Sequence, residues 1–217
     1  LAFLQQISVR AADDLPSMVQ APLVFRGYCA PADMTDVAGR IVVCFGTKRH
    51  GQTTAAGRVK AVQDAGGRAI VQVDDPGFTI EPPRWPAAYA RTITFADAKP
   101  GPGLPAMTLS AEAFALLIEG SGQNPARLLE DGGQVRPLPS FDIPARLRAV
   151  LARTNRDYTS KNILGVLPGR DPALSAQHLV LGAHLDGYGY GEPVAGDALY
   201  NGALDDAAYV ALIEQLA

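Results

Sequence analysis

The chain has 217 residues, with 19 basic and 22 acidic side chains and a formal net charge of -3. A charge this small gives no long-range field that would attract nucleic acid or an anionic membrane surface, so neither is expected as a partner. The longest apolar runs, such as IVVCF, are far shorter than the roughly 20 residues needed to span a bilayer, so no membrane span is expected. The length allows one domain or two.

The first half of the chain contains short apolar runs bounded by glycine. Residues 1–20 are expected to form a short helical or irregular lead-in, and the runs LVFRG and GRIVVCFG that follow are expected to form buried strands. Residues 51–67 place apolar side chains at helical spacing, with Thr53 or Thr54 as a possible N-cap and two glycines at the end. The next run, RAIVQVDD, predicts a second strand parallel to the first, with a right-handed crossover.

The segment around residues 75–103 is dense in proline and glycine, which predicts a long surface loop or covering flap around Trp85. A short strand should follow, and then a helix that begins after Ser110, buries Phe114 and ends at Gly120.

The last third of the chain should begin near residue 136, where two prolines and a serine suggest a domain junction. Three successive strands are expected in the runs ARLRAVLAR, NILGVLPG and HLVLGAHLD. The arginines of the first run alternate with apolar residues, which favours the solvated face of a strand over a phosphate-binding patch.

The two cysteines, Cys29 and Cys44, are too few for a disulfide framework or a zinc finger. The pattern favours a free Cys29 in a loop and a buried Cys44 in a strand. A bridge between them is the alternative, and it would fit an oxidising compartment.

His184 and Asp186 follow an apolar run and are two residues apart, so they share one face at the carboxyl end of an extended segment. A neutral imidazole is a good zinc ligand, and its second nitrogen is normally held by a carboxylate or carbonyl. Asp186 is therefore expected to orient His184. Asp205 and Asp206 lie at the start of the last predicted helix, where carboxylates also stabilise the helix dipole, so alone they indicate no site.

The ordered string NILGVLPGRDPALSAQHLVLGAHLDGYG, followed by GDALYNGALDDAA, closely resembles the family of co-catalytic di-zinc aminopeptidases and carboxypeptidases. Residues 21–135 resemble the protease-associated domain that these enzymes often carry as an insert, through the runs LVFRGYC, VAGRIVVCFG, AVQDAGGRAIV and LPAMTLSAEAF.

The resemblance implies that His184 is a ligand of the first zinc, Asp205 the carboxylate that bridges two zincs, and the Asp205–Asp206 peptide bond cis. Two metals sharing such a ligand polarise a carbonyl and activate a water. The chain departs from the family pattern after Asp205: Asp206, two alanines and Tyr209 stand where asparagine, a small residue, serine and glycine are usual.

The family's remaining zinc ligands and its glutamate base come later than Ala217, and His50 and His178 are in the wrong places to replace them. Residues 207–217 read as a helix without a terminating signal, so we expect the sequence to be part of a longer protein and to be inactive on its own. No signal peptide is visible, and a secreted or periplasmic location is implied by the family alone.

The expected fold class is α/β with an α+β insert: a β-rich protease-associated domain joined to the start of a mixed-sheet zinc-peptidase domain. The expected boundaries are a lead-in at residues 1–20, the insert at 21–135 and the truncated peptidase domain at 136–217. The expected activity is that of a zinc-dependent exopeptidase, foremost an aminopeptidase, acting on peptides with two zinc ions. A carboxypeptidase or amidohydrolase of the same fold and a non-catalytic, receptor-like protein are the alternatives.

Overall fold

The computed structural model describes residues 1–10, 12, 15–78, 92–97 and 103–216. The chain forms two compact units, Leu1–Arg153 and Thr154–Ala217. Neither sequence-based boundary, at residue 20 or residue 135, coincides with this division. The assignment of residues 1–20 and 136–153 to the peptidase region stays a prediction.

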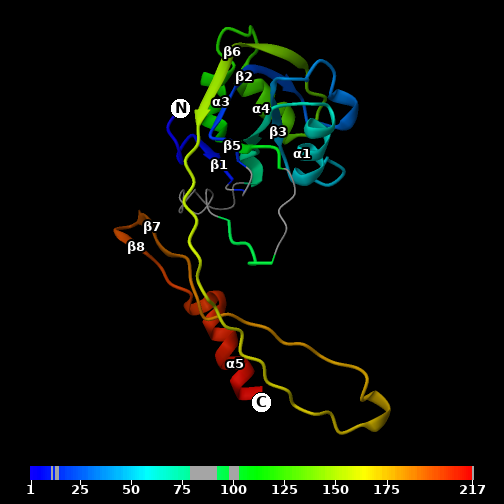
Figure 1. Cartoon of the computed structure of the whole chain (residues 1–217), viewed down its shortest axis with the longest axis vertical. Helices are drawn as coiled ribbons and strands as arrows, with labels where there is room; N and C mark the ends of the chain where they lie inside the picture. Colours follow the sequence, from blue (N-terminus) through cyan, green and yellow to red (C-terminus); the bar gives the residue numbers. More distant parts are fainter. Residues whose placement is uncertain (11, 13–14, 79–91, 98–102, 217) are drawn as a thin grey trace. The chain divides into compact units, whose positions relative to one another are not determined.

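The first unit is built on a six-stranded mixed sheet with the order β1-β5-β4-β3-β2-β6 (Figure 1). Its strands are β1 (Ile7–Val9), β2 (Met18–Arg26), β3 (Ile41–Gly46), β4 (Ala69–Asp74), β5 (Ala106–Leu109) and β6 (Ser140–Val150). The four central strands, β2 to β5, are parallel to one another. The two edge strands are antiparallel to their partners, β1 to β5 and β6 to β2.

Helices cover both faces of this sheet, which explains why the central strands are predominantly apolar instead of alternating strictly with polar residues. On one face, Val62 of α1 (Ala55–Asp64) packs with β3 and β4 side chains such as Val42 and Ile70. On the other face, Phe114 of α3 (Ala111–Leu117) and Leu128 of α4 (Pro125–Gly133) pack against alternate residues of the same strands. The predicted parallel strand-helix-strand unit is confirmed.

The helix starts follow ordinary capping chemistry. Of the two possible caps of α1, Thr54 is used: its side chain accepts a hydrogen bond from the Gly57 amide. Ser110 caps α3 as predicted, through the Ala113 amide. The short helix α4 was not predicted, although Asn124 as N-cap and Pro125 as first residue are a recognisable start signal.

The edges of the sheet correct one sequence-based expectation and extend another. The lead-in was expected to be helical or irregular, but its described residues contribute β1, which pairs with β5, and the start of β2 at Met18. The arginine-rich run belongs to β6, which pairs along β2 in the first unit. Its alternation is as predicted, with Leu147 against the core and Arg148 exposed.

Cys29 and Cys44 form a disulfide, so the expectation of free thiols was wrong. The turn after β2 places Cys29 with a positive φ of 54° beside Cys44 in β3, at a Cα separation of 5.6 Å. Both residues are fully buried. Sequence spacing alone could not reveal this approach, since it depends on the parallel pairing of β2 with β3.

Most of the predicted loop around residues 75–103, including Trp85, lies outside the described residues. Its first turn is described as the short helix η2 (Pro76–Phe78). Among the described residues, no helix is long and apolar enough to cross a membrane.

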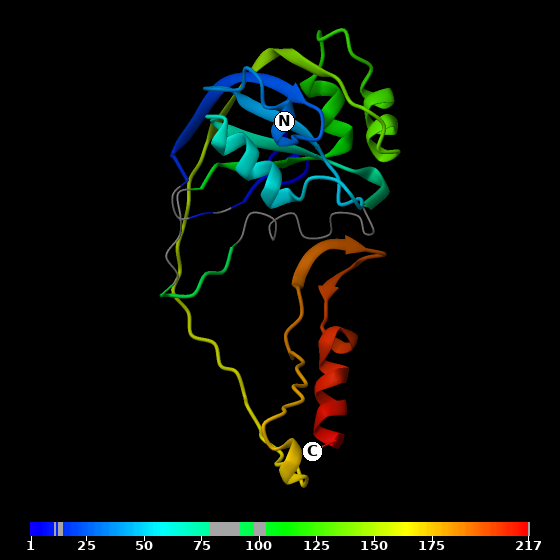
Figure 2. The ribbon, with the colours of Figure 1, turned by 90° about the vertical axis from the view of Figure 1, so that its right-hand side faces the viewer.

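The second unit consists of a hairpin, three helical segments and long extended stretches. Figure 2 shows the hairpin leading into the red C-terminal helix. Its elements are η3 (Pro172–Leu174), β7 (Gly189–Val194), β8 (Asp197–Tyr200), η4 (Ala203–Ala207) and α5 (Ala208–Leu216). The hairpin was not predicted, but Ala195 and Gly196 both have positive φ, and such a two-residue turn suits the twist of paired strands.

The strands predicted at residues 162–169 and 178–186 are absent from this unit. Ile163 and Leu164 are 95% and 90% exposed, and Leu179 is 88% exposed. A strand needs a hydrogen-bonded neighbour, and within the described part of this unit only β7 and β8 pair. The apolar pattern marks these two segments as potential strands, but neither pairs with another strand in the described part of this unit.

Candidate metal centre

Two glycines bring the predicted site residues together within the second unit. A Cβ placed on Gly187 would lie 2.5 Å from the Gly202 nitrogen, and one on Gly202 would lie 2.5 Å from the Asp186 carbonyl oxygen. Such distances exclude any side chain, so the two backbone segments approach as closely as glycine permits. The approach places His184 and Asp186, on the first segment, beside Asp205, which follows the second.

His184 lies between two carboxylates. Its Nδ1 is 3.1 Å from Asp186 Oδ1 and 3.1 Å from the Asp186 carbonyl oxygen. Both of those atoms only accept hydrogen bonds, so a neutral imidazole with its proton on Nδ1 satisfies these contacts. Its Nε2, which then has a free lone pair, faces Asp205 Oδ1 at 3.5 Å.

This arrangement fits part of a zinc site. In this tautomer the Nε2 lone pair faces an Asp205 oxygen with no proton between them, and a cation bound between the two atoms would satisfy both. Nitrogen and oxygen ligands bind zinc at about 2.0–2.2 Å in tetrahedral geometry, which places two ligand atoms roughly 3.3 Å apart, close to the observed spacing. A carboxylate on the other ring nitrogen is the usual support of a zinc-bound histidine. The structure thus gives Asp186 the geometry of an orienting group.

The turn that presents Asp205 is irregular. The Asp205–Asp206 peptide bond is cis, at the position that the family resemblance indicates, and both residues have non-helical dihedral angles within η4. The Ala207 amide donates to the Gly202 carbonyl oxygen at 3.0 Å and closes the turn. Asp205 is exposed and points its carboxylate at His184.

The described residues contain no group of three or more His, Cys, Asp or Glu side chains that could hold a metal ion. His178 lies in an exposed extended stretch of the second unit, and His50 belongs to the first unit. The residues of this unit therefore supply one orienting carboxylate and two candidate ligands. The glycine contacts that assemble them were not recognised from the sequence, where Gly187 and Gly202 look like ordinary loop residues.

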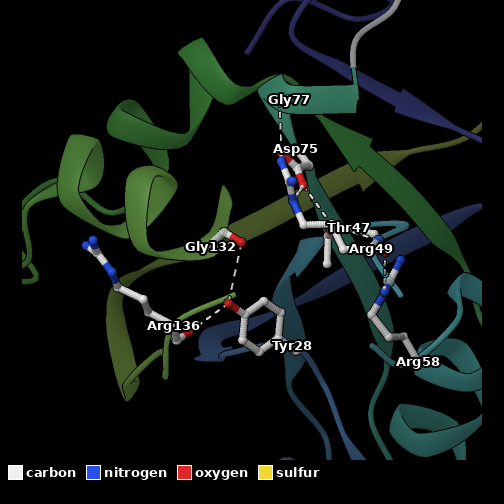
Figure 3. A network of polar contacts seen from close by, with 8 residues as sticks. All are labelled: Tyr28, Thr47, Arg49, Arg58, Asp75, Gly77, Gly132 and Arg136. Carbon is white, nitrogen blue, oxygen red and sulfur yellow. Dashed lines mark hydrogen bonds and ion pairs between the residues drawn. The ribbon is translucent and has the colours of Figure 1, made fainter. Parts of the chain in front are cut away.

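A second polar cluster lies in the first unit, at the carboxyl ends of β3 and β4 (Figure 3). The Asp75 side chain is 1% exposed and accepts hydrogen bonds from Thr47 Oγ1 at 2.7 Å, Arg49 Nε at 3.0 Å and the Gly77 amide at 2.9 Å. Burial raises the pKa of this carboxyl, but these hydrogen bonds and the Arg49 charge outweigh it and hold the pKa below its ordinary value.

The guanidinium of Arg49 also stacks on Phe78, 5.0 Å from the ring centre, at the first turn after β4. Arg58, which is 2% exposed, donates to Gln72 Oε1 at 2.7 Å and to the carbonyl oxygens of Thr47 and Thr53. Burial lowers the pKa of Arg58. These bonds tie the β3–α1 loop to the sheet, so this cluster has a structural role.

Tyr28 extends the cluster towards α4. Its hydroxyl donates to the Arg136 carbonyl oxygen at 2.7 Å, and the Gly132 carbonyl oxygen lies 3.5 Å away (Figure 3). Burial and the negative charges of Asp131 and Asp75 raise the pKa of Tyr28, so the hydroxyl keeps its proton and remains a donor.

The comparisons with known proteins agree with both parts of this picture. Residues 19–117 match the model of the PA domain, and residues 162–217 match that of peptidase family M28. The comparison with curated proteins gives no significant match. A solved structure, the aminopeptidase from Aneurinibacillus sp. strain AM-1, is similar with 13% sequence identity and a TM-score of 0.34, over 66% of this chain and 31% of that chain.

The fold and the site define a two-part protein, a mixed α/β domain followed by a segment with metal-binding geometry. The chain carries a PA domain and part of a peptidase family M28 domain, as the sequence motifs predicted. It spans about a third of the length of the aminopeptidase named above. At that identity and TM-score, the likeness transfers no activity to this chain.

Proposed function

We propose that the full-length protein containing this chain is a zinc-dependent exopeptidase, foremost an aminopeptidase that releases N-terminal residues from peptides. The observation that carries the proposal is the position of His184, with Asp186 on one ring nitrogen and Asp205 facing the other. The match of residues 162–217 to an M28 peptidase supports the reaction class.

In this proposal the chain's own residues have distinct tasks. His184 Nε2 and Asp205 Oδ1 would hold zinc, and Asp205 would also be available to the second ion. Asp186 accepts a hydrogen bond from Nδ1–H of His184. This contact fixes the tautomer and turns the free lone pair on Nε2 towards Asp205. When bound, zinc polarises a scissile carbonyl and lowers the pKa of a water.

The described residues supply too few ligands for two ions and no general base beside His184, so we expect the 217-residue chain alone to be inactive. The disulfide Cys29–Cys44 supports a secreted or periplasmic location, because such bonds persist in oxidising compartments.

Two alternatives remain distinct from this proposal. A carboxypeptidase of the same family would share the zinc ligands and differ in how it holds the substrate's terminal charge. A receptor-like protein would keep the fold without turnover. The paired geometry of His184 and Asp205 favours a metal-dependent enzyme over the receptor-like alternative.

The experiment is a comparison of peptide hydrolysis by the full-length protein and its Asp205→Ala variant. Three substrates separate the activities: an aminoacyl anilide with a free N-terminus, the same anilide with a blocked N-terminus, and a peptide with a free C-terminus only. The proposal predicts hydrolysis of the first substrate alone and its loss in the variant. Equal turnover by Asp205→Ala would refute the role of this residue, and cleavage of the third substrate alone would favour the carboxypeptidase.

A further inference from the structure

Asn201 and Gly202 form an Asn-Gly pair between β8 and η4. The chain has asparagine at four positions: before proline at Asn124, before arginine at Asn155, before isoleucine at Asn162 and before glycine at Asn201. Cyclisation of asparagine requires the next backbone nitrogen to attack the side-chain carbonyl carbon. Proline has no N–H, and a β-branched side chain crowds the approach, whereas glycine leaves it open.

The local geometry favours this attack. Asn201 is exposed, and its Oδ1 accepts a hydrogen bond from the Ala203 amide at 3.0 Å. This Asx turn closes a hydrogen-bonded ring that contains both the Asn201 side-chain carbonyl carbon and the Gly202 nitrogen, so it restrains the two reacting atoms in one small ring. The same hydrogen bond withdraws electron density from the side-chain carbonyl, so the carbon becomes a better target for a nucleophile.

A larger residue after Asn201 would be the simplest protection against cyclisation, but the packing around Gly202 excludes it. A Cβ on Gly202 would lie 2.5 Å from the Asp186 carbonyl oxygen and 3.1 Å from that of Asp205. Glycine is therefore required at position 202 by the contact that brings His184 to Asp205. The labile pair is a consequence of how the site is assembled.

We propose that Asn201 is a site of spontaneous deamidation and that its modification disrupts the pairing of His184 with Asp205. The Gly202 nitrogen loses its proton to base and forms a bond to Asn201 Cγ; the Cγ–Nδ2 bond breaks, and ammonia leaves. Water then opens the five-membered imide at either carbonyl. One product is an aspartyl residue, and the other is an isoaspartyl residue that carries the main chain through the side-chain methylene.

The isoaspartyl product lengthens the main chain by one carbon directly before Gly202. The Gly187–Gly202 contact has no spare space, so the added carbon displaces residues 202–205 relative to residues 184–187. The 3.5 Å spacing between His184 Nε2 and Asp205 Oδ1 is then lost. The effect on zinc and turnover rests on the proposed function, whereas the modification itself does not.

The test ages the full-length protein in mildly alkaline buffer and maps its peptides by mass at intervals. The expected result is a gain of about one dalton at residue 201, with an isoaspartyl fraction, while Asn155 and Asn162 of the same sample stay unmodified. The variant Asn201→Ser is the control, because its hydroxyl can still accept from the Ala203 amide but cannot form the imide. It should keep its zinc and activity during ageing, while the wild type loses both in proportion to the isoaspartyl fraction.

Two results would overturn the proposal in different parts, and a third would refute only the proposed function. If Asn201 keeps its side-chain amide in the folded protein but deamidates in urea-unfolded protein in the same buffer, the fold protects Asn201. If zinc and turnover survive complete isoaspartyl formation, the structural consequence is wrong. Fresh protein that binds no zinc would refute the proposed function alone, because the mass measurement still decides whether Asn201 deamidates.

Discussion

His184 Nε2 and Asp205 Oδ1 face each other at 3.5 Å, although a hairpin and two turns separate them in the sequence. Their approach depends on backbone contact between Gly187 and Gly202. With its proton on Nδ1, His184 would turn the Nε2 lone pair towards Asp205, and the spacing of the two atoms suits a cation held between them. Gly202 has no side chain that could bind a metal, but this contact makes it important for the site.

Replacing Gly202 with alanine should weaken zinc retention by the full-length protein. The new Cβ would lie 2.5 Å from the Asp186 carbonyl oxygen, so the two segments must separate. Gly182→Ala is the matched control, because a Cβ there meets nothing within 4 Å. Dialysis against a chelator, followed by elemental analysis, measures the difference. Equal zinc loss in the two variants would argue against the glycine contact as the basis of the site.

Arg58→Met should destabilise the first unit. The substitution removes three hydrogen bonds and leaves buried carbonyl oxygens of the β3–α1 loop without a donor, at a cost of about 1–3 kcal/mol for each group left unsatisfied. Lys60→Met on the same helix is the control. Lys60 is exposed and pairs with Asp64, a type of pair that contributes roughly 0.3–0.5 kcal/mol. Urea unfolding of both variants checks the prediction, which fails if their midpoints coincide.

Asp75 should make stability depend on acid. Its pKa is lower in the folded protein than the ordinary value of 3.8, so its ionised form stabilises the fold above that value. The contribution is lost as pH falls through the folded pKa. Asp75→Asn should therefore reduce the free energy of unfolding at neutral pH by about 1–3 kcal/mol, and the difference from wild type should shrink in acid. Asp142→Asn serves as an exposed control, since that carboxylate is 68% exposed. If the difference in free energy of unfolding between wild type and Asp75→Asn does not shrink as the pH is lowered, the role of Asp75 is contradicted.

Opening the disulfide should also destabilise the first unit. Cys29 and Cys44 are 15 residues apart, and closing a loop of that length restricts the unfolded chain by about 3 kcal/mol. The double variant with alanine at both positions should unfold at lower urea concentration than the oxidised wild type. A reductant should bring the wild type to the level of the variant and leave the variant unchanged. If a reductant leaves the unfolding midpoint of the wild type unchanged, the disulfide between Cys29 and Cys44 is absent in solution.

The sequence predicted the elements whose signals are local. Ser110 caps its helix through the next turn, and the apolar runs before and after α1 form the parallel strands β3 and β4. Features that depend on distant neighbours were missed or wrong. The bond between Cys29 and Cys44 requires two strands to pair, and the pairing of β6 with β2 was not predicted because β2 lies far back in the sequence.

The candidate site follows the same rule. His184 and Asp186 were predicted to lie together from their two-residue spacing, and the structure adds the contact of Nδ1 with Asp186. The approach of Asp205 was implied by the family resemblance alone, because it depends on the β7–β8 hairpin, which the glycine-rich sequence did not reveal.

Zinc content is the most direct test of the central claim. Elemental analysis should be made on the full-length protein, on His184→Ala and on Asp205→Asn, each purified without added metal. The account predicts about two zinc ions per wild-type molecule and a loss in both variants, larger in Asp205→Asn because that carboxylate is proposed to serve both ions. Wild-type protein without zinc, or variants that retain the full amount, would contradict it.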